Sequence, residues 1–171
     1  MACSILGVLE NNEVMYLERA EPYSSLRLYT QIGKREPLYC TALGKILMAA
    51  LPEKECDHIA EQLDYTPYTP NSASGFEELK KEILFAREHG YAVDREEHTL
   101  GSSCLAMPVY DYTGNVAAAL SISRVGLFER YSEQDIYEKM YEAASRLSRR
   151  MGYTAPLPRR ITGARRDGDR T

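Results

Sequence analysis

The stretch GYAVDREEHTLGSSCLAMPVYDYTGNVAAALSIS, residues 90–123, contains the clearest structural signals of this chain. Residues 91–94, 102–111 and 116–125 are rich in strand-forming residues, and a loop through Thr113-Gly114-Asn115 separates the last two runs. This pattern predicts a hairpin of two long strands next to a third, shorter strand. Gly101 is expected to form a tight turn before the second run, because glycine tolerates positive φ angles.

Ser121 and Ser123 alternate with large aliphatic residues in the last of these strands. Successive side chains of a strand point to opposite faces, so both hydroxyls are expected on one face of the sheet. Ala117 and Ala119 share that face. Small apolar residues there favour a covered cavity over an outer face that is simply wetted by solvent.

The pairing of the two long strands raises a question of register. If Tyr110 pairs with Val116, then Cys104 pairs with Ile122 and points away from the serines, unless a bulge shifts the ladder by one residue. Pro108 cannot donate a backbone hydrogen bond and suits such a bulge or a sheet edge. We therefore predict an irregularity between Cys104 and Tyr110.

The N-terminal part of the chain also predicts strands. Residues 3–20 contain two β-rich runs around Asn11-Asn12, which tolerate the positive φ angles of a hairpin turn. Residues 25–33 are expected to add a third strand, followed by an exposed connection at Lys34-Arg35-Glu36.

Helices are predicted between and after these strands. Thr41 is a candidate cap for a helix over residues 42–51 that is apolar nearly all round and hence buried. Pro52 suits the first turn of a second helix over residues 52–63. A third helix is expected to open with a capping box formed by Ser74 and Glu77 and to end at Gly90.

A last helix is expected to open with Ser132 and Asp135. Its predicted core face consists of Ile136, Met140, Ala143, Leu147 and Met151. Strands at both ends of the chain with helices between them indicate an α+β domain, in which helices cover an antiparallel sheet.

Composition is that of an ordinary globular domain. The chain has 171 residues, of which 44% are hydrophobic and 27% charged, so one core is expected. No apolar run is long enough for a membrane span and no secretory signal is visible, so we expect no membrane contact and a cytoplasmic location. Cys3, Cys40, Cys56 and Cys104 are accordingly expected as reduced thiols.

Charge is distributed unevenly along the chain. Residues 153–171 hold five of the 21 basic and two of the 25 acidic residues, which leaves 16 basic and 23 acidic residues in 1–152. A body this acidic is a poor phosphate binder. The tail is rich in Pro, Gly and Arg, and we interpret residues 153–171 as a flexible, solvated extension rather than a nucleic-acid contact.

The motifs TALGKILMAAL, GYAVDREEHTLGSSCLAMPVYDYTG and AALSIS, in this order, resemble the effector-binding domain of the IclR family of bacterial transcription regulators. The resemblance covers about residues 3–152, and we assign 1–152 to this domain. It implies a curved antiparallel sheet like those of GAF and profilin-like sensor domains, with flanking helices and a ligand pocket on one face.

The family also carries an N-terminal winged helix-turn-helix that binds DNA, and only Met1 and Ala2 precede Cys3 here. A fragment trimmed to its sensor domain accounts for this most simply, and a free-standing sensor that pairs with other chains is the alternative. The resemblance implies contact with DNA only through the absent domain, and assembly into homodimers or homotetramers.

The same resemblance implies an effector site formed by Thr41, Ala42, Leu43, Asp94, Cys104, Ser121 and Ser123. Free N–H groups at the start of a helix, together with its dipole, suit a carboxylate. We therefore expect a small organic acid as effector, no cofactor and no catalysis. An ordinary helix start packed on the sheet is the alternative for Thr41 to Leu43, and a structural role is the alternative for Asp94.

The segment Glu96-Glu97-His98 is implied to be a loop that orders the mouth of the pocket, and charged loop residues are usually solvated. Tyrosines near the expected rim are candidates for sizing the pocket. They are Tyr23, Tyr29, Tyr39 and Tyr68.

Three other functions deserve comparison. A cysteine enzyme would use Cys104 as nucleophile with His98 or His89 as base, but an apolar strand raises the pKa of a thiol rather than activating it. A metal site from Cys56 and His58, or from the other two histidines, lacks a zinc-site spacing. A ligand-free oligomerisation module would leave the serines facing a filled core.

Overall fold

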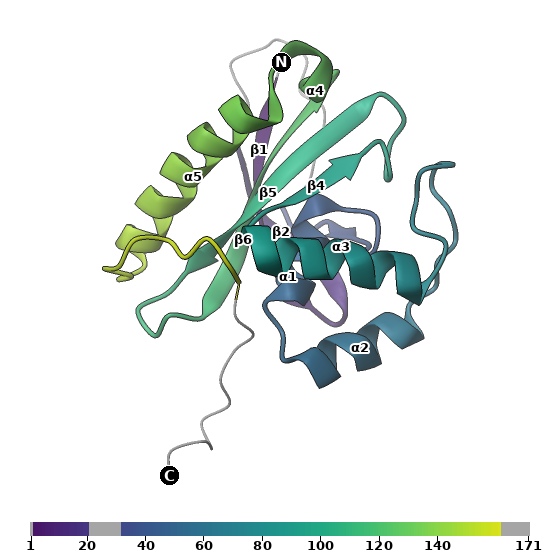
Figure 1. Cartoon of the computed structure of the whole chain (residues 1–171), viewed down its shortest axis with the longest axis horizontal. Coiled ribbons are helices and arrows are strands. Elements are labelled where there is room, and N and C mark those ends of the chain that lie inside the picture. The colour runs from purple at the N-terminus through teal and green to yellow at the C-terminus, as the bar shows by residue number, and fades with distance from the viewer. Residues whose placement is uncertain (1, 21–31, 162–171) are drawn as a thin grey trace.

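A computed structural model describes residues 2–20 and 32–161 (Figure 1). Its strands are β1 (Cys3–Glu10), β2 (Glu13–Ala20), β3 (Arg35–Glu36), β4 (Ala92–Arg95), β5 (Ser102–Tyr110) and β6 (Val116–Val125). Its helices are α1 (Ala42–Ala49), α2 (Glu53–Gln62), α3 (Phe76–His89), α4 (Leu127–Arg130) and α5 (Glu133–Arg150). None of the described helices is both long and apolar enough to cross a membrane.

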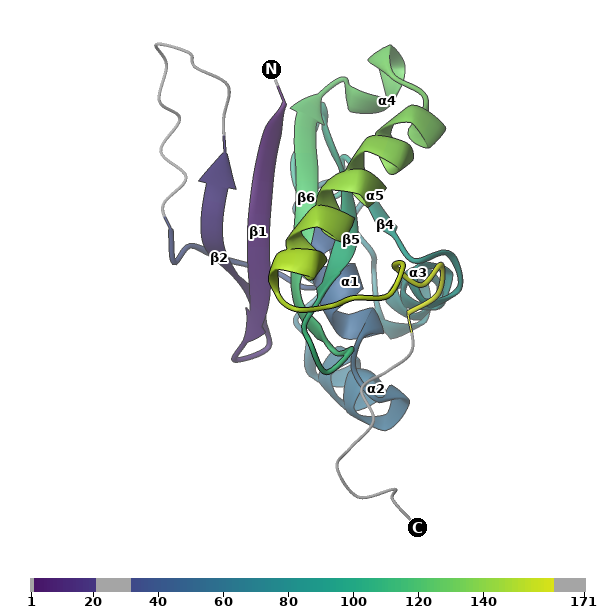
Figure 2. The same cartoon turned by 90° about the vertical axis from the view of Figure 1, so that its left-hand side faces the viewer.

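The strands form one antiparallel sheet in the order β3-β2-β1-β6-β5-β4. Helix α5 lies across one face, whereas α1, α2 and α3 gather on the other (Figures 1 and 2). Each face has its own hydrophobic core: Leu105 and Leu120 pack toward α5, and Ala106 and Ala119 pack toward α1. The predicted α+β class and curved, helix-flanked sheet are confirmed.

The two hairpins form as their turn residues predict. Asn11 and Asn12 both adopt positive φ angles between β1 and β2. In the second hairpin Tyr110 pairs with Val116, the register shifts between Val109 and Tyr110, and Cys104 consequently pairs with Ser123. The predicted irregularity is confirmed, and its effect is to turn Cys104 toward the serine face.

Helix α1 is buried along its whole length. The Thr41 hydroxyl accepts a hydrogen bond from the N–H of Gly44 at 3.1 Å and donates to the Pro37 carbonyl at 2.7 Å. The predicted cap is therefore confirmed. Gly44 allows the close approach that this packing needs, because a Cβ atom there would lie 2.3 Å from the Leu38 carbonyl oxygen.

The capping residues predicted for two other helices agree with the structure in one case and disagree in the other. The Ser132 cap of α5 is confirmed, since its hydroxyl accepts from the Asp135 N–H. The Ser74–Glu77 capping box is wrong: α3 starts after Gly75, and the Ser74 N–H donates to the carboxylate of Glu78 instead. The helix begins one residue later than the box requires, so the acidic residue four positions on reaches that donor.

The predicted core face of α5 is partly wrong. Ile136 and Met140 are buried as expected, but the lower half of the helix buries Ala144 and Ser148, and Met151 is exposed. The Ser148 hydroxyl accepts from the Tyr110 N–H at the bulge, so a polar contact with β5 sets the rotation of this end.

Two further expectations differ from the structure. The connection at residues 34–36 is not simply exposed, because Arg35 and Glu36 pair with β2 as strand β3 and the Glu36 side chain is buried. Most of the strand expected over residues 25–33 lies outside the described residues. The short helix α4 was not predicted.

The C-terminal segment packs on the domain at least as far as Ile161. Leu157 and Ile161 are buried, the Tyr141 hydroxyl donates to the Leu157 carbonyl, and the Ile161 N–H donates to the Arg87 carbonyl. The interpretation of residues 153–161 as a flexible extension therefore does not describe this part of the chain. Residues 162–171, the rest of that expected extension, lie outside the described residues.

Candidate effector pocket

The strand register brings the polar residues of the candidate site into one row across the sheet. Asp94 on β4 pairs with Cys104 on β5, Cys104 pairs with Ser123 on β6, and Ser123 pairs with Cys3 on β1. Paired residues of an antiparallel sheet point to the same face. The row therefore faces α1, one pair of residues away from Ser121.

A cavity of about 100 Å³ lies between this row and the start of α1. All seven site residues implied by the resemblance line it: Thr41, Ala42, Leu43, Asp94, Cys104, Ser121 and Ser123. The structure thus brings together residues from α1, β4, β5 and β6. The remaining lining residues are Ile5, Tyr16, His98, Thr99 and Ser102.

The start of α1 offers backbone donors to the cavity. The first N–H groups of a helix have no partner within it. The Thr41 side chain takes up the N–H of Gly44, and in the part of the chain that the structure describes no acceptor bonds the N–H groups of Ala42 and Leu43. Ala42 and Leu43 line the cavity, so two unused donors and the positive end of a helix dipole lie at its wall, which suits an anion.

On the opposite wall, Asp94 is a buried carboxyl group. Burial raises its pKa to about 6, and the nearby charge of Glu97 acts in the same direction, whereas a hydrogen bond from the Glu97 N–H opposes the shift. That bond measures 2.7 Å. Asp94 is therefore mostly ionised at pH 7 but takes up a proton as the pH falls towards 6, and its protonated form can donate a hydrogen bond to an oxygen of a ligand.

The thiol of Cys104 is not activated. Burial raises its pKa far above the usual range, and the charge of Asp94 adds to this effect. A thiol with a raised pKa is a poor nucleophile near neutral pH. Ser102 and Ser123, 3.3 Å apart through their hydroxyl oxygens, lie beside it. The arrangement is that of a polar binding wall, and it does not support the cysteine-enzyme alternative.

Residues 96–101, which we call the closing segment, complete the cavity wall with His98 and Thr99. The expectation that its charged residues are solvated does not hold for Glu97, whose side chain is 12% exposed. The Glu96 carboxylate accepts from the Gly101 N–H, and the Glu97 carboxylate accepts from the ammonium group of Lys45, 2.6 Å away. The loop forms a tight turn at Gly101, where φ is +79° as expected. The Glu97 carboxylate points inward to the buried Lys45, whereas the Glu96 bond lies at an exposed position.

His98 also has defined partners. Its Nε2 lies 3.0 Å from the carboxylate of Glu36, and its ring stacks on Tyr68 with centroids 4.7 Å apart. Burial opposes ionisation of Glu36, but hydrogen bonds from His98 and Lys34 outweigh it and lower the pKa of this carboxyl group. Of the rim tyrosines, Tyr39 and Tyr68 lie next to each other, while Tyr23 and Tyr29 are outside the described residues.

The residues of the metal alternatives do not converge. Cys56 is buried, whereas the exposed His58 contacts Gln62. His89 stacks on Phe85, away from His98. Within residues 2–20 and 32–161, no group of three or more histidine, cysteine or acidic side chains could hold a metal ion.

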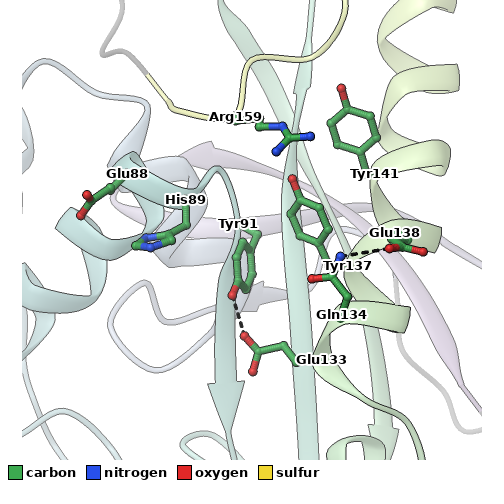
Figure 3. Close-up of a pocket in the computed structure, with 9 residues that line it drawn as sticks. All are labelled: Glu88, His89, Tyr91, Glu133, Gln134, Tyr137, Glu138, Tyr141 and Arg159. Carbon is green, nitrogen blue, oxygen red and sulfur yellow. Dashed lines mark hydrogen bonds between the residues drawn. The ribbon is translucent and has the colours of Figure 1, made fainter.

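A wider groove of about 890 Å³ lies between α3 and α5 (Figure 3). Tyr91, Tyr137, Tyr141 and Arg159 are among its lining residues, and the Tyr91 hydroxyl donates to Glu133 at 2.6 Å. Ligand sites enclose most of a small ligand's surface. Because several side chains of this groove are exposed and none belongs to the polar row, the smaller cavity is the better candidate for a small effector.

The sequence reasoning missed two groups of site residues. Tyr16 and Ile5 come from the first hairpin, whose position beside β6 depends on long-range pairing. Lys45 is fully buried in a helix that was judged from its apolar residues alone. A lysine in an otherwise apolar helix is itself a signal, because a buried charge needs a partner.

Comparison with known proteins identifies the family. The family described as "Bacterial transcriptional regulator IclR C-terminal" matches residues 3–149. The HTH-type transcriptional regulator XynR of Escherichia coli is 37% identical over 153 residues, covering 88% of this chain and 60% of XynR. The regulator KdgR of E. coli is 38% identical over 151 residues, covering 86% of this chain and 57% of KdgR.

Solved structures agree with the sequence matches. The crystal structure of the C-terminal domain of E. coli KdgR superposes with a TM-score of 0.77 at 35% identity, covering 89% of this chain and 88% of that one. The chain spans less than two thirds of the full XynR and KdgR sequences. These relatives are named as regulators, in agreement with the expectation that the chain is not an enzyme. The chain belongs to the IclR family of bacterial transcriptional regulators and corresponds to their C-terminal domain.

Proposed function

We propose that this domain senses a small organic acid for a transcription regulator and binds it in the cavity beneath α1. The main observation in support is that Ala42 and Leu43, whose N–H groups are unused, line the same small cavity as a row of polar side chains. A carboxylate bound there would accept from the helix start, and its other oxygens would meet Ser121, Ser123 and Asp94.

Cavity size favours a small effector. A volume of about 100 Å³ accommodates an acid of two or three carbon atoms, such as glyoxylate or pyruvate. Larger sugar acids or aromatic acids would need the closing segment to move outward. The acidic body makes direct DNA contact by this domain unfavourable, so we propose that DNA is bound through a separate domain, in the cytoplasm.

Effector binding would act through the arrangement of subunits in a homodimer or homotetramer. A ligand shifts such an equilibrium only if it binds one arrangement more tightly than the other. The closing segment supplies a structural basis for such a difference, because its position determines the shape of the cavity. A ligand-free oligomerisation module is the competing function, and the polar side chains that line the cavity speak against it.

The decisive experiment is a thermal shift of the full chain with glyoxylate, pyruvate, gluconate and benzoate. A ligand at 100 times its Kd adds about 2.7 kcal/mol of stability, which raises Tm by several degrees. The Ser121→Ala/Ser123→Ala variant is expected to lose the shift, whereas Ser145→Ala on α5, outside the cavity, is expected to keep it. A folded protein that shifts with none of the acids would contradict the carboxylate assignment.

A further inference from the structure

Lys45 on α1 connects this helix to the closing segment on the other side of the pocket, although it does not itself line the cavity. The side chain is fully buried, and its Nζ lies 2.9 Å from the Val93 carbonyl oxygen, 2.6 Å from the Glu97 carboxylate and 3.3 Å from that of Glu82. An ammonium group has three donors. All three are therefore used, one by β4, one by the closing segment and one by α3.

The buried ammonium group of Lys45 calls for a structural explanation. Burying an ammonium group is costly unless it is paired and hydrogen-bonded, and a well-packed apolar side chain often serves stability as well or better. Every other residue of α1 is apolar. This comparison favours a role for Lys45 in fixing the geometry of its partners over a role in adding stability.

The main partner of Lys45 is Glu97, and the N–H, the carbonyl and the carboxylate of Glu97 all form hydrogen bonds. Its N–H donates to Asp94 at 2.7 Å, its carbonyl accepts from the hydroxyl of Ser72 at 2.6 Å and from that of Thr69 at 3.1 Å, and its carboxylate bonds Lys45. The next two residues of the chain line the cavity. The position of Glu97 thus sets the position of that wall.

We propose that Lys45 is a positioning residue, which fastens the closing segment to α1 and so keeps the effector pocket closed. This inference rests on the proposed function and extends it to the control of access. Helix α1 would then carry both the backbone donors for the effector, at its first turn, and the attachment point of the segment that encloses it. An effector that contacts both parts favours the closed arrangement over the open one.

The test compares Lys45→Met with Lys80→Met, which makes the same chemical change in the more exposed ion pair between Lys80 and Asp57. Amide hydrogen exchange of the full chain without ligand reports the order of the closing segment. We expect exchange at the Glu97 and Gly101 amides to rise about tenfold in Lys45→Met, because losing a hydrogen bond between charged groups lowers the free energy of local opening. Exchange in β5 should change no more than in the Lys80 variant.

An unchanged rate at these two amides would overturn the proposal. An equal rise in β5 would also overturn it, because it would make Lys45 a residue of general stability. Glu97→Gln, which keeps the size of the side chain, is expected to give a smaller local rise, and no rise would count against the role of this ion pair.

Pyruvate binding, measured by calorimetry at a temperature where each variant is folded, provides a separate readout. We expect Lys45→Met to raise the apparent Kd about tenfold, because opening of the segment lowers the fraction of binding-competent protein, and Lys80→Met to leave it unchanged. An unaltered Kd in Lys45→Met would refute the link to the pocket. If the wild-type protein bound none of the acids, the proposed function would fail, while the exchange data would still decide whether Lys45 fastens the segment.

Discussion

The carboxyl group of Asp94 has a pKa of about 6 because it is buried, well above its ordinary value of 3.8. A raised pKa means that the folded state holds the proton more tightly than the unfolded chain does. The stability contributed by this proton is complete below about pH 4 and is lost as the pH rises through about 6. Burial thus makes Asp94 a pH-sensitive group of the pocket wall.

Asp94→Asn should remove this pH dependence, because its amide oxygen still accepts from the Glu97 N–H but carries no charge. The free energy of unfolding of the wild type is expected to fall relative to the variant by about 1–3 kcal/mol between pH 4 and pH 7. Urea denaturation across this range measures the difference. The other ionisable groups are the same in both proteins, and a constant difference would contradict the assignment.

At the level of elements, the approach of α1 to the preceding loop depends on Gly44. An added Cβ atom would lie 2.3 Å from the Leu38 carbonyl oxygen and 2.5 Å from its Cα, and backbone atoms cannot rotate away. Either α1 or the loop would have to move, which would disturb the first turn of the helix at the pocket.

Gly44→Ala is therefore expected to lower the free energy of unfolding by about 1–3 kcal/mol or more, the usual cost of overpacking. Gly75→Ala is the matched control, since a Cβ atom there meets nothing within 4 Å and its backbone is extended. The control should stay within about 1 kcal/mol of the wild type. Chemical denaturation of both variants checks this, and equal effects would show that the close contact does not govern stability.

On the scale of the whole molecule, the C-terminal segment completes the domain. Leu157 packs in the core under α5, and Ile161 packs in the core of the opposite face, near α3. Two side chains of one segment thus contribute to both cores of the sheet. The packed unit extends beyond residue 152, where its end was predicted.

Leu157→Ala and Ile161→Ala should each lower the free energy of unfolding by about 2–4 kcal/mol, because both remove buried methyl groups. Arg160→Ala, at an exposed position between them, should change it by less than about 0.5 kcal/mol. Thermal and urea unfolding of the full chain measure these differences. A small effect of both core variants would indicate that the segment detaches readily in solution.

Local chemistry made much of the fold predictable from the sequence. The Asn11-Asn12 turn, the Thr41 and Ser132 caps and the αL glycine at position 90 depend on neighbouring residues only. The register conflict between Cys104 and the serines also predicted the bulge, because the alternation of side chains in a strand allows only one resolution. The positions of the seven site residues around one cavity followed from the family resemblance.

What the sequence by itself determined were therefore the strands β1, β2, β4, β5 and β6, the starts of α1 and α5 and the polar face of β6, since these depend on contacts within a few residues. The tertiary structure alone decided that Lys45 meets Glu97, that Glu36 meets His98 and that Leu157 and Ile161 belong to the core. These pairs lie far apart along the chain, and no local pattern specifies such partners. Their positions depend on the packing of α1, β3 and the C-terminal segment against the finished sheet, because only there does a buried charge find its counter-charge.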